Sequence, residues 1–533
     1  MMVDVARVLR WRLVALAVGI GMAAAGAFAE ETARGTVFHD ENGNGVLDDG
    51  EPGLEGVLVS NGRDVTATHG DGRYELPVWD DCIVFVIKPR DWAVPVDENK
   101  LPRFHYIHNP GGSPELEYPG VEPTGPLPAA IDFPLTRHED PETYTAIAFA
   151  DPQPYNLGQI EYLAFDVVSE LVGTDAVFGM TLGDIVGDQL NLFEPMNEVV
   201  GQIGIPWWNI AGNHDLNFDG EGFWDVSKTF QRVYGPPWYA FEYGPVSFIA
   251  LHSTDWHGDG YTGGVNEDQL AFMRNYLAHV PEDNLVVLLM HIPLIHDDDQ
   301  VPGHAIENPA DVLAVLENHP NSMSLSGHWH NQTHYFVEQG EHGWMHEEPH
   351  HHFVVGTASG SWWRGHHDEY GIPHATMDDG TPNGYLILTF EGNAYRFVWK
   401  PARRPIEWQM NIYAPDTVAR ADIAETEIVA NAWSDSARCT VEMRLNGEGP
   451  WVAMERYIGP DPNFQRLQTL NAFIPEQLGG EVIDFYDYSH WENLYSLWRA
   501  PMPDLEPGGH RITVRFTDLF GQVFENHRVI RVE

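Results

Sequence analysis

Three patterns of hydrophobic and polar positions follow one another along the chain. From residue 33 to 138, short apolar runs such as 56–60 and 82–87 are separated by Asn-Gly and Asp-Gly turns, which predicts a small β-sandwich domain. From 140 to 400, apolar runs alternate with segments of helical spacing, which is typical of an α/β domain. From 405 to 533, alternation with period two returns and predicts a carboxyl-terminal β-sandwich domain.

The central region carries the clearest element signals. It predicts strands at 144–150, 176–182, 207–211, 285–290 and 322–325, and helices at 159–172, 267–278 and 311–317. The run 285–290 is continuously apolar, as expected for a strand in a sheet buried on both faces. A carboxylate, amide or imidazole stands just beyond each carboxyl end, which is where α/β folds place their functional groups.

Composition supports several packed cores and narrows the partners. With 533 residues, 43% of them hydrophobic, the chain is expected to form two to four domains and is not of disordered composition. Asp plus Glu number 79 against 29 Lys plus Arg, a formal net charge of −50 that repels phosphate backbones. We therefore expect no extended nucleic-acid binding. The two cysteines cannot form a disulfide framework and are expected to be buried.

The first 29 residues have the pattern of a secretory signal peptide. A basic start with Arg7, Arg10 and Arg12 precedes an apolar run that ends in Ala27-Phe28-Ala29, an A-x-A cleavage site. The sequence thus predicts a secreted or periplasmic protein cleaved near Ala29. An uncleaved membrane anchor is the alternative, although the run is short for a span. No transmembrane segment is expected in the mature chain.

Five short segments with metal-ligand side chains occur in order within residues 151–330. They are Asp151-Pro152-Gln153, Gly183-Asp184, Gly212-Asn213-His214-Asp215, Met290-His291 and Gly327-His328-Trp329-His330. Each alone is an ordinary turn or boundary residue. Together they resemble the two-metal site of the calcineurin-like metallophosphoesterases, and the flanking regions resemble the secreted type with amino-terminal and carboxyl-terminal β domains.

The resemblance implies a fold, a pair of metals and their ligands. The fold is α/β, a four-layer β-sandwich flanked by helices, with the two β domains added. The metals are two divalent or mixed-valence transition-metal ions, drawn from Mn, Fe, Zn or Co, to which nitrogen and oxygen ligands without cysteine are suited. The implied ligands are Asp184 as bridge, Asp151, Gln153 and His330 for one ion, and Asn213, His291 and His328 for the other. Gln153 stands where the family usually has His, so whether it ligates is open.

The resemblance also implies a reaction on a phosphoester substrate. Two cations about 3.5–4 Å apart acidify a water molecule and neutralise phosphoryl oxygens. His214 would act as general acid or transition-state donor, Asp215 would orient it, and Asp188 would support the site from behind. Monoesters and diesters remain open as substrates. The alternative function is a calcium-stabilised cell-surface binding protein whose phosphoesterase domain is inactive.

Residues 40–51 match the EF-loop pattern at every ligand position. The side chains are Asp40, Asn42, Asn44, Asp48 and Glu51, with the carbonyl of Val46 as the sixth ligand. Pro52 follows at once and neither flank has helical spacing, so the loop resembles the calcium loops of secreted Cna-B or SdrD-like modules. We expect a structural Ca²⁺ there, or else an acidic Asn-Gly turn without an ion. A surface partner could bind through the β domains.

Two further segments allow more than one interpretation. His346, His350, His351 and His352 form a cluster that is either a solvated loop binding adventitious metal or part of the active-site rim. The adjacent Trp362 and Trp363, beside a Gly-rich turn, form either a substrate platform or packing between domains.

Overall fold

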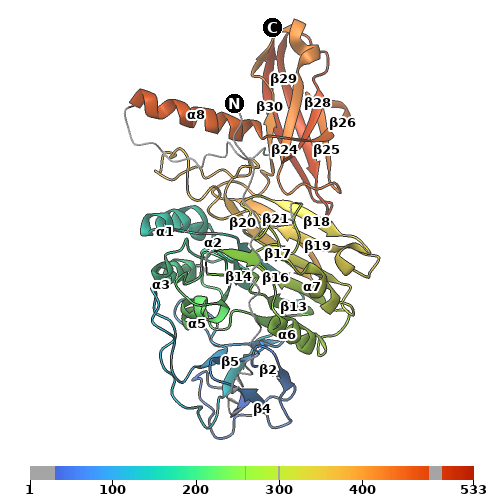
Figure 1. Cartoon of the computed structure of the whole chain (residues 1–533). Helices are drawn as coiled ribbons and strands as arrows, with labels where there is room; N and C mark the ends of the chain where they lie inside the picture. Colours follow the sequence, from blue (N-terminus) through green and yellow to red (C-terminus); the bar gives the residue numbers. More distant parts are fainter. Residues whose placement is uncertain (1–30, 259, 298–300, 479–494) are drawn as a thin grey trace, which may run out of the picture.

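The computed structural model describes residues 31–258, 260–297, 301–478 and 495–533. The amino-terminal sheets lie at one end of the molecule, a mixed α/β region forms the centre, and the last sheets stand at the other end (Figure 1). The predicted export signal at 1–29 lies outside the described residues. Among the described helices, none has both the length and the apolar character that a membrane crossing requires.

The amino-terminal region folds as two four-stranded sheets. In spatial order their strands are β4 (Arg73–Val78), β1 (Glu31–His39), β8 (Phe133–Arg137) and β6 (Trp92–Ala93), and β3 (Val65–Ala67), β2 (Leu58–Ser60), β5 (Cys82–Val86) and β7 (His105–His108). Its apolar core continues into that of the central region, because Phe85 packs on Phe272 and Phe104 on Trp208. The two regions therefore share one hydrophobic core.

Two larger sheets form the centre. Their spatial orders are β11 (Trp207–Ile210), β10 (Phe178–Leu182), β9 (Thr143–Phe149), β20 (Gly384–Glu391), β21 (Ala394–Pro401), and β12 (Tyr239–Tyr243), β13 (Val246–Ala250), β16 (Leu285–Leu289), β17 (Ser322–Ser326), β19 (His350–Val354), β18 (Thr333–Val337). In the first sheet β9, β10 and β11 are parallel, and in the second β13, β16, β17 and β19 are parallel. A small hairpin, β14 (Thr254–Trp256) and β15 (Tyr261–Gly263), lies beside them.

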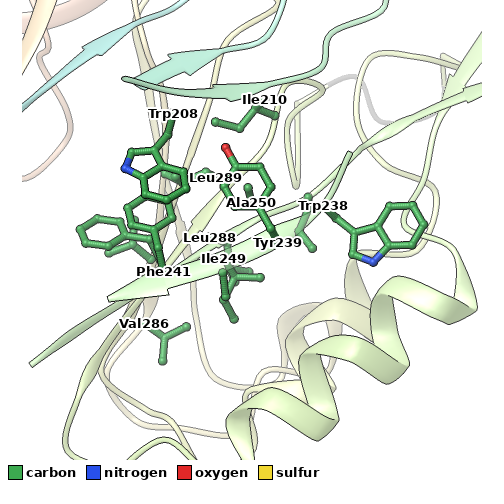
Figure 2. Close-up of a cluster of buried hydrophobic side chains, with 14 of the residues drawn as sticks. Trp208, Ile210, Trp238, Tyr239, Phe241, Ile249, Ala250, Val286, Leu288 and Leu289 are labelled. Atoms are coloured by element: carbon green, nitrogen blue, oxygen red, sulfur yellow. The ribbon is translucent and has the colours of Figure 1, made fainter. Parts of the chain in front are cut away.

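The two central sheets pack face to face, with helices outside. Side chains alternate along β9, so that Ala146 and Ala148 join the core between the sheets while Ile147 and Phe149 join a separate core under the helices. Between the sheets, the ring of Trp208 from β11 stacks on Phe241 from β12 at 4.3 Å (Figure 2). Figure 2 also shows aliphatic side chains of β13 and β16 in the same cluster.

Helices complete the four layers on both outer faces. The first sheet is covered by α1 (Leu157–Leu163), which continues through a π-helical turn (Ala164–Val168) into α2 (Ser169–Leu171), by α3 (Phe193–Val200), and by α4 (Phe223–Val226) and α5 (Lys228–Tyr234) nearby. Beside the second sheet lie α6 (Glu267–Leu277) and α7 (Pro309–Val315) (Figure 1). The predicted α/β four-layer sandwich is confirmed.

The carboxyl-terminal region has its own core between two sheets. Their spatial orders are β22 (Met410–Tyr413), β24 (Glu427–Ala432), β28 (Tyr495–Pro501), β27 (Glu455–Gly459), and β23 (Thr417–Val418), β30 (Val523–Val532), β29 (Gly508–Thr517), β25 (Thr440–Leu445), β26 (Glu448–Ala453). A helix, α8 (Pro462–Leu478), interrupts this β region and was not predicted from the sequence. Asp461 accepts the backbone N–H of Phe464 at its start, an N-cap contact that the β pattern around it conceals.

The carboxyl-terminal sandwich is fixed to the central region by buried polar contacts. Asn431 on β24 donates to the carbonyl of Asp379, in the turn before β20, and to the carboxylate of Asp461. Tyr413 donates to the same carboxylate at 2.7 Å. A Cβ on Gly380 would lie 2.2 Å from Cγ of Asp461, so the turn fits the sandwich only as glycine. The contact surfaces are thus closely matched in shape.

Candidate metal centre

The predicted site residues gather at one edge of the two central sheets. Parallel strands bring their carboxyl ends to the same edge, and the strands β9, β10, β11, β16 and β17 each deliver a polar group there. The seven predicted ligands are Asp151, Gln153, Asp184, Asn213, His291, His328 and His330, of which six are buried and His328 is half-buried. Their proximity follows from strand direction in both sheets.

One group of side chains surrounds the imidazole of His291. Its Nε2 lies 2.9 Å from Oδ1 of Asn213, 3.2 Å from Oδ1 of Asp184 and 3.2 Å from Nδ1 of His328. One ligand atom from each of Asp184, His291 and His328 falls within 4.8 Å of the others. Two nitrogens and two oxygens that face one another in this way could hold one transition-metal ion.

A second group surrounds the imidazole of His330. Its Nε2 lies 3.0 Å from Oε1 of Gln153 and 3.6 Å from Oδ1 of Asp151. The backbone joins this group to the first, because the N–H of His328 donates to Asp151 at 2.9 Å and the N–H of Gln153 donates to the carbonyl of Asp184 at 3.0 Å. The side chains therefore form two neighbouring groups, one around His291 and one around His330.

Backbone carbonyls orient the two buried imidazoles. Nδ1 of His291 lies 2.9 Å from the carbonyl of Leu182, and Nδ1 of His330 lies 2.5 Å from the carbonyl of Gly360. A carbonyl accepts only, so Nδ1 carries the proton and Nε2 keeps its lone pair for a ligand role when the ring is neutral. Gly360 belongs to the Gly-rich turn beside Trp362, which is the sequence feature that pointed to it.

The backbone at the centre is strained. Five of the seven predicted ligands have positive φ, with Asp151 at 42°, Gln153 at 40°, Asp184 at 49°, His328 at 81° and His330 at 50°. Non-glycine residues rarely adopt this region, and such strain concentrates at functional sites. The surrounding fold thus holds these side chains in orientations that a relaxed loop would not give.

Two motif glycines are required by the approach of ligand side chains. A Cβ on Gly183 would lie 2.4 Å from Nδ1 of His291, and a Cβ on Gly327 would lie 2.2 Å from Oδ2 of Asp151. Both distances are too short for any side chain. Each glycine therefore allows a ligand from one strand end to pack against the backbone of another.

The electrostatics of the centre fit bound cations. Burial raises the pKa of Asp151 to about 7, and neighbouring Asp184 adds to the increase. Burial would also raise the pKa of Asp184, but His291 and His214 lower it more, to below its usual range. Burial lowers the pKa of His330 to about 3, so this ring is neutral and can ligate. The buried Asp184 thus needs positive charge beside it, which the rings of His291 and His214 supply here and which divalent ions would supply when bound.

Asp188, rather than Asp215, contacts the imidazole of His214. Oδ1 of Asp188 lies 2.6 Å from Nδ1 of His214, while Nε2 of the ring lies 3.9 Å from Oδ2 of Asp184. Burial lowers the pKa of His214, but Asp184 and Asp188 raise it further, to about 9. The two carboxylates therefore favour the protonated ring, and its Nε2 lies on the side of Asp184.

The prediction that Asp215 orients His214 is corrected. The Asp215 carboxylate is fully buried and accepts the backbone N–H groups of Gly212, Ile185 and Val186 at 2.8 to 3.1 Å. These bonds tie the loop after β11 to the loop after β10. Asp215 therefore shapes the backbone. From the sequence, Asp188 was expected only to support the site and not to contact His214.

Three of the four clustered histidines lie on a buried strand. His350, His351 and His352 lie on β19, where neither a solvated metal-binding loop nor an active-site rim describes them. His350 and His352 alternate with the hydroxyls of Ser322, Ser324 and Ser326 on β17 at 2.7 to 3.3 Å. Their polar atoms are satisfied inside the sheet, which sequence alone did not indicate. His346 is half-buried beside Trp344, ring to ring at 4.7 Å.

The adjacent tryptophans have different surroundings. Trp362 is half-buried and stacks on the ring of His330 with 3.9 Å between centroids. Trp363 is buried in the core beneath the helices and donates its indole N–H to the carbonyl of Pro152 at 2.7 Å. Only Trp362 thus lies at the metal centre, while Trp363 supports the segment that carries Gln153.

The amino-terminal acidic loop is compact. The Asp40 carboxylate accepts the backbone N–H groups of three following residues, at 2.7 to 3.2 Å. The side-chain amides of Asn42 and Asn44 both donate to Asp48 at 2.8 Å. Both oxygens of Glu51 accept backbone N–H groups, and Val46 is exposed. The side chains of the predicted calcium ligands are therefore held close together by hydrogen bonds within the loop.

Comparisons with known proteins place the chain in a family. Residues 41–118 match the family model described as N terminal of calcineurin-like phosphoesterase, and residues 352–524 match C terminal of calcineurin-like phosphoesterase. Comparison with curated proteins gives no match. With the four-layer fold, both matches support a calcineurin-like metallophosphoesterase that carries both added domains.

Two solved structures are similar to the chain at low identity. The purple acid phosphatase PPD1 from yellow lupin (Lupinus luteus) seeds is 12% identical with a TM-score of 0.34, and the match covers 64% of this chain and 66% of that chain. PhoD is 11% identical with a TM-score of 0.34, and the match covers 64% of this chain and 78% of that chain. The match thus spans slightly less than two thirds of the lupin phosphatase.

Proposed function

We propose that the protein is an exported phosphoesterase that hydrolyses phosphate mono- or diesters with two transition-metal ions. The observation that carries the proposal is the pair of ligand sets, one around His291 and one around His330, at the common carboxyl edge of both sheets. Asp184, Asn213, His291 and His328 are proposed to hold one ion. Asp151, Gln153 and His330 are proposed to hold the other, with Asp184 as bridge.

When bound, the two ions would lower the pKa of a water molecule and neutralise charge on the phosphoryl oxygens. His214 supplies the acid. The water oxygen forms a bond to phosphorus as the bond to the leaving oxygen breaks, and Nε2–H of His214 protonates that leaving oxygen. One proton of the water stays on the new phosphate group and the other restores His214. Alcohol and phosphate are the products for a monoester.

Asp188 keeps His214 ready for this role. Its bond to Nδ1 directs Nε2 toward Asp184, and its charge favours the protonated ring. The Asp188 carboxylate thus orients the His214 ring through Nδ1, just as backbone carbonyls orient the rings of His291 and His330.

The experiment is hydrolysis by the purified mature protein loaded in turn with Mn, Fe, Zn and Co, over a panel of monoesters and diesters. We expect two metal ions per chain by elemental analysis and turnover that falls at least 100-fold in Asp184→Asn and His214→Ala. Full occupancy by metal with no turnover on any ester would instead favour a surface-binding protein with an inactive centre.

Two further proposals concern the rest of the chain. Export is supported by the basic, apolar and A-x-A order of residues 1–29. A structural Ca²⁺ at residues 40–51 is supported by the EF-loop spacing and by the convergence of Asp40, Asn42, Asn44 and Asp48.

A further inference from the structure

A cavity of about 750 Å³ adjoins the metal centre and is closed on its far side by the carboxyl-terminal sandwich. Its wall on the central region includes His328, His330 and Trp362, and its wall on the sandwich includes Trp433 and Asp435. A phosphoryl group held between the two ligand sets would therefore have its esterified group in this cavity. The lining of the cavity then selects the substrate.

The charge of the lining excludes a polyanionic group. Among the described residues that line the cavity, Arg456 is the only basic residue of the Lys or Arg type, and it forms an ion pair with Asp435 at 3.1 Å. Two other aspartates, Asp297 and Asp379, also line the cavity. A second phosphate would meet repulsion rather than a counter-charge. The esterified group is consequently neutral or cationic.

Three polar atoms of the wall distinguish these two classes. Within the described residues, Oδ1 of Asp378, Nε2 of Gln332 and Nε1 of Trp433 are buried without a hydrogen-bond partner. Asp378 is 8% exposed and Trp433 is 2% exposed. A buried polar atom without a partner lowers stability, so these atoms favour a bound ligand that can pair with them. One is an acceptor and two are donors.

A hydroxyl group both donates and accepts, so a polyol can satisfy all three atoms. An organic cation would satisfy the carboxylate and leave both N–H donors unpaired. Gln332 is well fixed for this purpose, because its backbone N–H donates to Asp379 at 3.0 Å and its side-chain oxygen accepts from Ser434. The donor and acceptor pattern thus favours the neutral, hydroxyl-rich class.

Aromatic rings supply the remaining surface. Trp362 stacks on His330 at 3.9 Å, and Trp329 stacks on His296 at 4.0 Å, so both indoles are held by a second ring. Tyr261 and Tyr335 also line the cavity. Rigid rings with a few placed polar groups are typical of pockets for small ligands, and the C–H face of a saturated sugar or cyclitol ring packs well on them.

Resting on the proposed function, we propose that this cavity binds a neutral polyhydroxylated leaving group, so that the substrate is the phosphate ester of a sugar or cyclitol. The hydroxyls bond to Asp378, Gln332 and Trp433, and a ring face packs on Trp362. Burial, and then the neighbouring Asp379, raise the pKa of Asp378 to about 8. Hydroxyl donors favour the charged form of a carboxylate, so ligand binding lowers that pKa.

The kinetic test compares esters on the metal-loaded enzyme. The panel is glucose 6-phosphate, myo-inositol 1-phosphate, phosphocholine, ATP and p-nitrophenyl phosphate. We expect kcat/KM for the best sugar or cyclitol ester to exceed that for phosphocholine and ATP at least tenfold. Asp378→Asn, which keeps the shape of the side chain, and Trp433→Phe, which removes the N–H donor and keeps an aromatic ring, should lower it at least tenfold, with a loss for p-nitrophenyl phosphate at least five times smaller. The exposed Asp175→Asn is the matched control.

A binding test separates this inference from the proposed function. Calorimetric titration of the metal-free protein with glucose and with myo-inositol should show binding of at least one, weakened at least tenfold by Asp378→Asn. Binding without hydrolysis of any ester would support the inference and contradict the phosphoesterase proposal. Hydrolysis of p-nitrophenyl phosphate with no preference for polyol esters and no polyol binding would overturn the inference alone. A preference for phosphocholine would also overturn it.

Discussion

The carboxylate of Asp188 lies 2.6 Å from Nδ1 of His214, while the neighbouring Asp215 faces away into three backbone N–H groups. Two acidic residues close to one histidine therefore have separate tasks. Asp188 sets the charge and direction of the ring, and Asp215 holds two loops together. Substitutions can separate these tasks by experiment.

Replacing Asp188 with Asn is expected to shift the alkaline limb of the pH–rate profile to lower pH. Activity requires protonated His214, whose pKa of about 9 depends on Asp184 and Asp188. Without one of these charges the pKa falls, by about one pH unit, so the ring loses its proton sooner as pH rises. We also expect kcat to fall about tenfold. Steady-state kinetics from pH 5 to 10 measure both effects.

The matched control is Asp215→Asn. An amide cannot accept three N–H bonds in the same way, so the free energy of unfolding should fall by about 1–3 kcal/mol. The alkaline limb should stay in place. A shift of that limb in Asp215→Asn, and none in Asp188→Asn, would contradict the assignment of both roles.

Replacing Gln153 tests the second ligand set. Gln153→Ala removes the oxygen that lies 3.0 Å from Nε2 of His330, so we expect bound metal to fall from two ions toward one per chain. Gln153→His restores the ligand pattern usual in the family and should keep two ions, with tighter binding of Zn. Elemental analysis after dialysis against graded chelator gives the answer. Equal metal content in all three proteins would show that Gln153 does not ligate.

The adjacent tryptophans should separate activity from stability. Trp362→Ala removes the ring stacked on His330, so kcat/KM should fall at least tenfold with little change in unfolding. Trp363→Ala empties a buried site and removes a hydrogen bond to Pro152, so unfolding should become easier by about 3–5 kcal/mol. Urea titrations and kinetics on both variants check this. A large loss of stability in Trp362→Ala, together with a loss of activity alone in Trp363→Ala, would contradict these roles.

Acid should destabilise the central sheet through β19. Burial lowers the pKa of His350 to about 3, against about 6.5 in an unfolded chain. Between these values the unfolded chain binds a proton that the folded chain does not. The free energy of unfolding therefore falls as pH drops from 6.5 toward 3, by about 1.4 kcal/mol per pH unit for this group.

The measurement is urea unfolding at pH 7, 6, 5 and 4, followed by tryptophan fluorescence. His350→Gln should reduce the slope of stability against pH. The exposed His527→Gln should leave it unchanged. An identical slope in His350→Gln and the wild type would mean that His350 is not held neutral.

Calcium should stabilise the amino-terminal sandwich if the loop at 40–51 binds it. We expect the melting temperature of the wild type to rise with millimolar CaCl₂ and to fall with a calcium chelator. Asp40→Asn should abolish the response, since this carboxylate organises the loop through three backbone N–H bonds. The exposed Asp80→Asn, in the same region, should keep it. A chelator effect that persists in Asp40→Asn would place the ion elsewhere.

The strands of the central sheets and the site residues at their ends were predictable from the sequence. Buried strands have a recognisable local composition, and parallel strands end at the same edge of a sheet. The predicted strands 285–290 and 322–325 correspond to Leu285–Leu289 and Ser322–Ser326. The first is a continuous apolar run, as expected of a buried parallel strand. Their ends then carried His291 and His328 to one edge. The two groups of side chains follow from this geometry, whereas their assignment to two metal ions rests on the family resemblance.

Features that depend on packing between distant segments were not predictable. The contact of Asp188 with His214 depends on how the loops after β10 and β11 meet. The buried histidines of β19 pair with serines of another strand, which the sequence does not indicate. Three consecutive histidines, His350 to His352, were therefore wrongly expected to be exposed or at the site rim. The helix over 462–478 lies in a region dominated by strands, and the cavity wall around Trp433 exists only because the last sandwich docks there.

The buried carboxylate of Asp461 has a practical consequence for dissecting the molecule. Because it fills the space above Gly380 and accepts from Tyr413 and Asn431, the turn that precedes β20 is shaped by atoms supplied from beyond residue 405. A recombinant fragment that stops before the last sandwich would leave the turn around Gly380 exposed to solvent and would lack one wall of the cavity. Biochemistry on such a truncated product would describe a damaged enzyme, so expression trials should retain the complete carboxyl terminus.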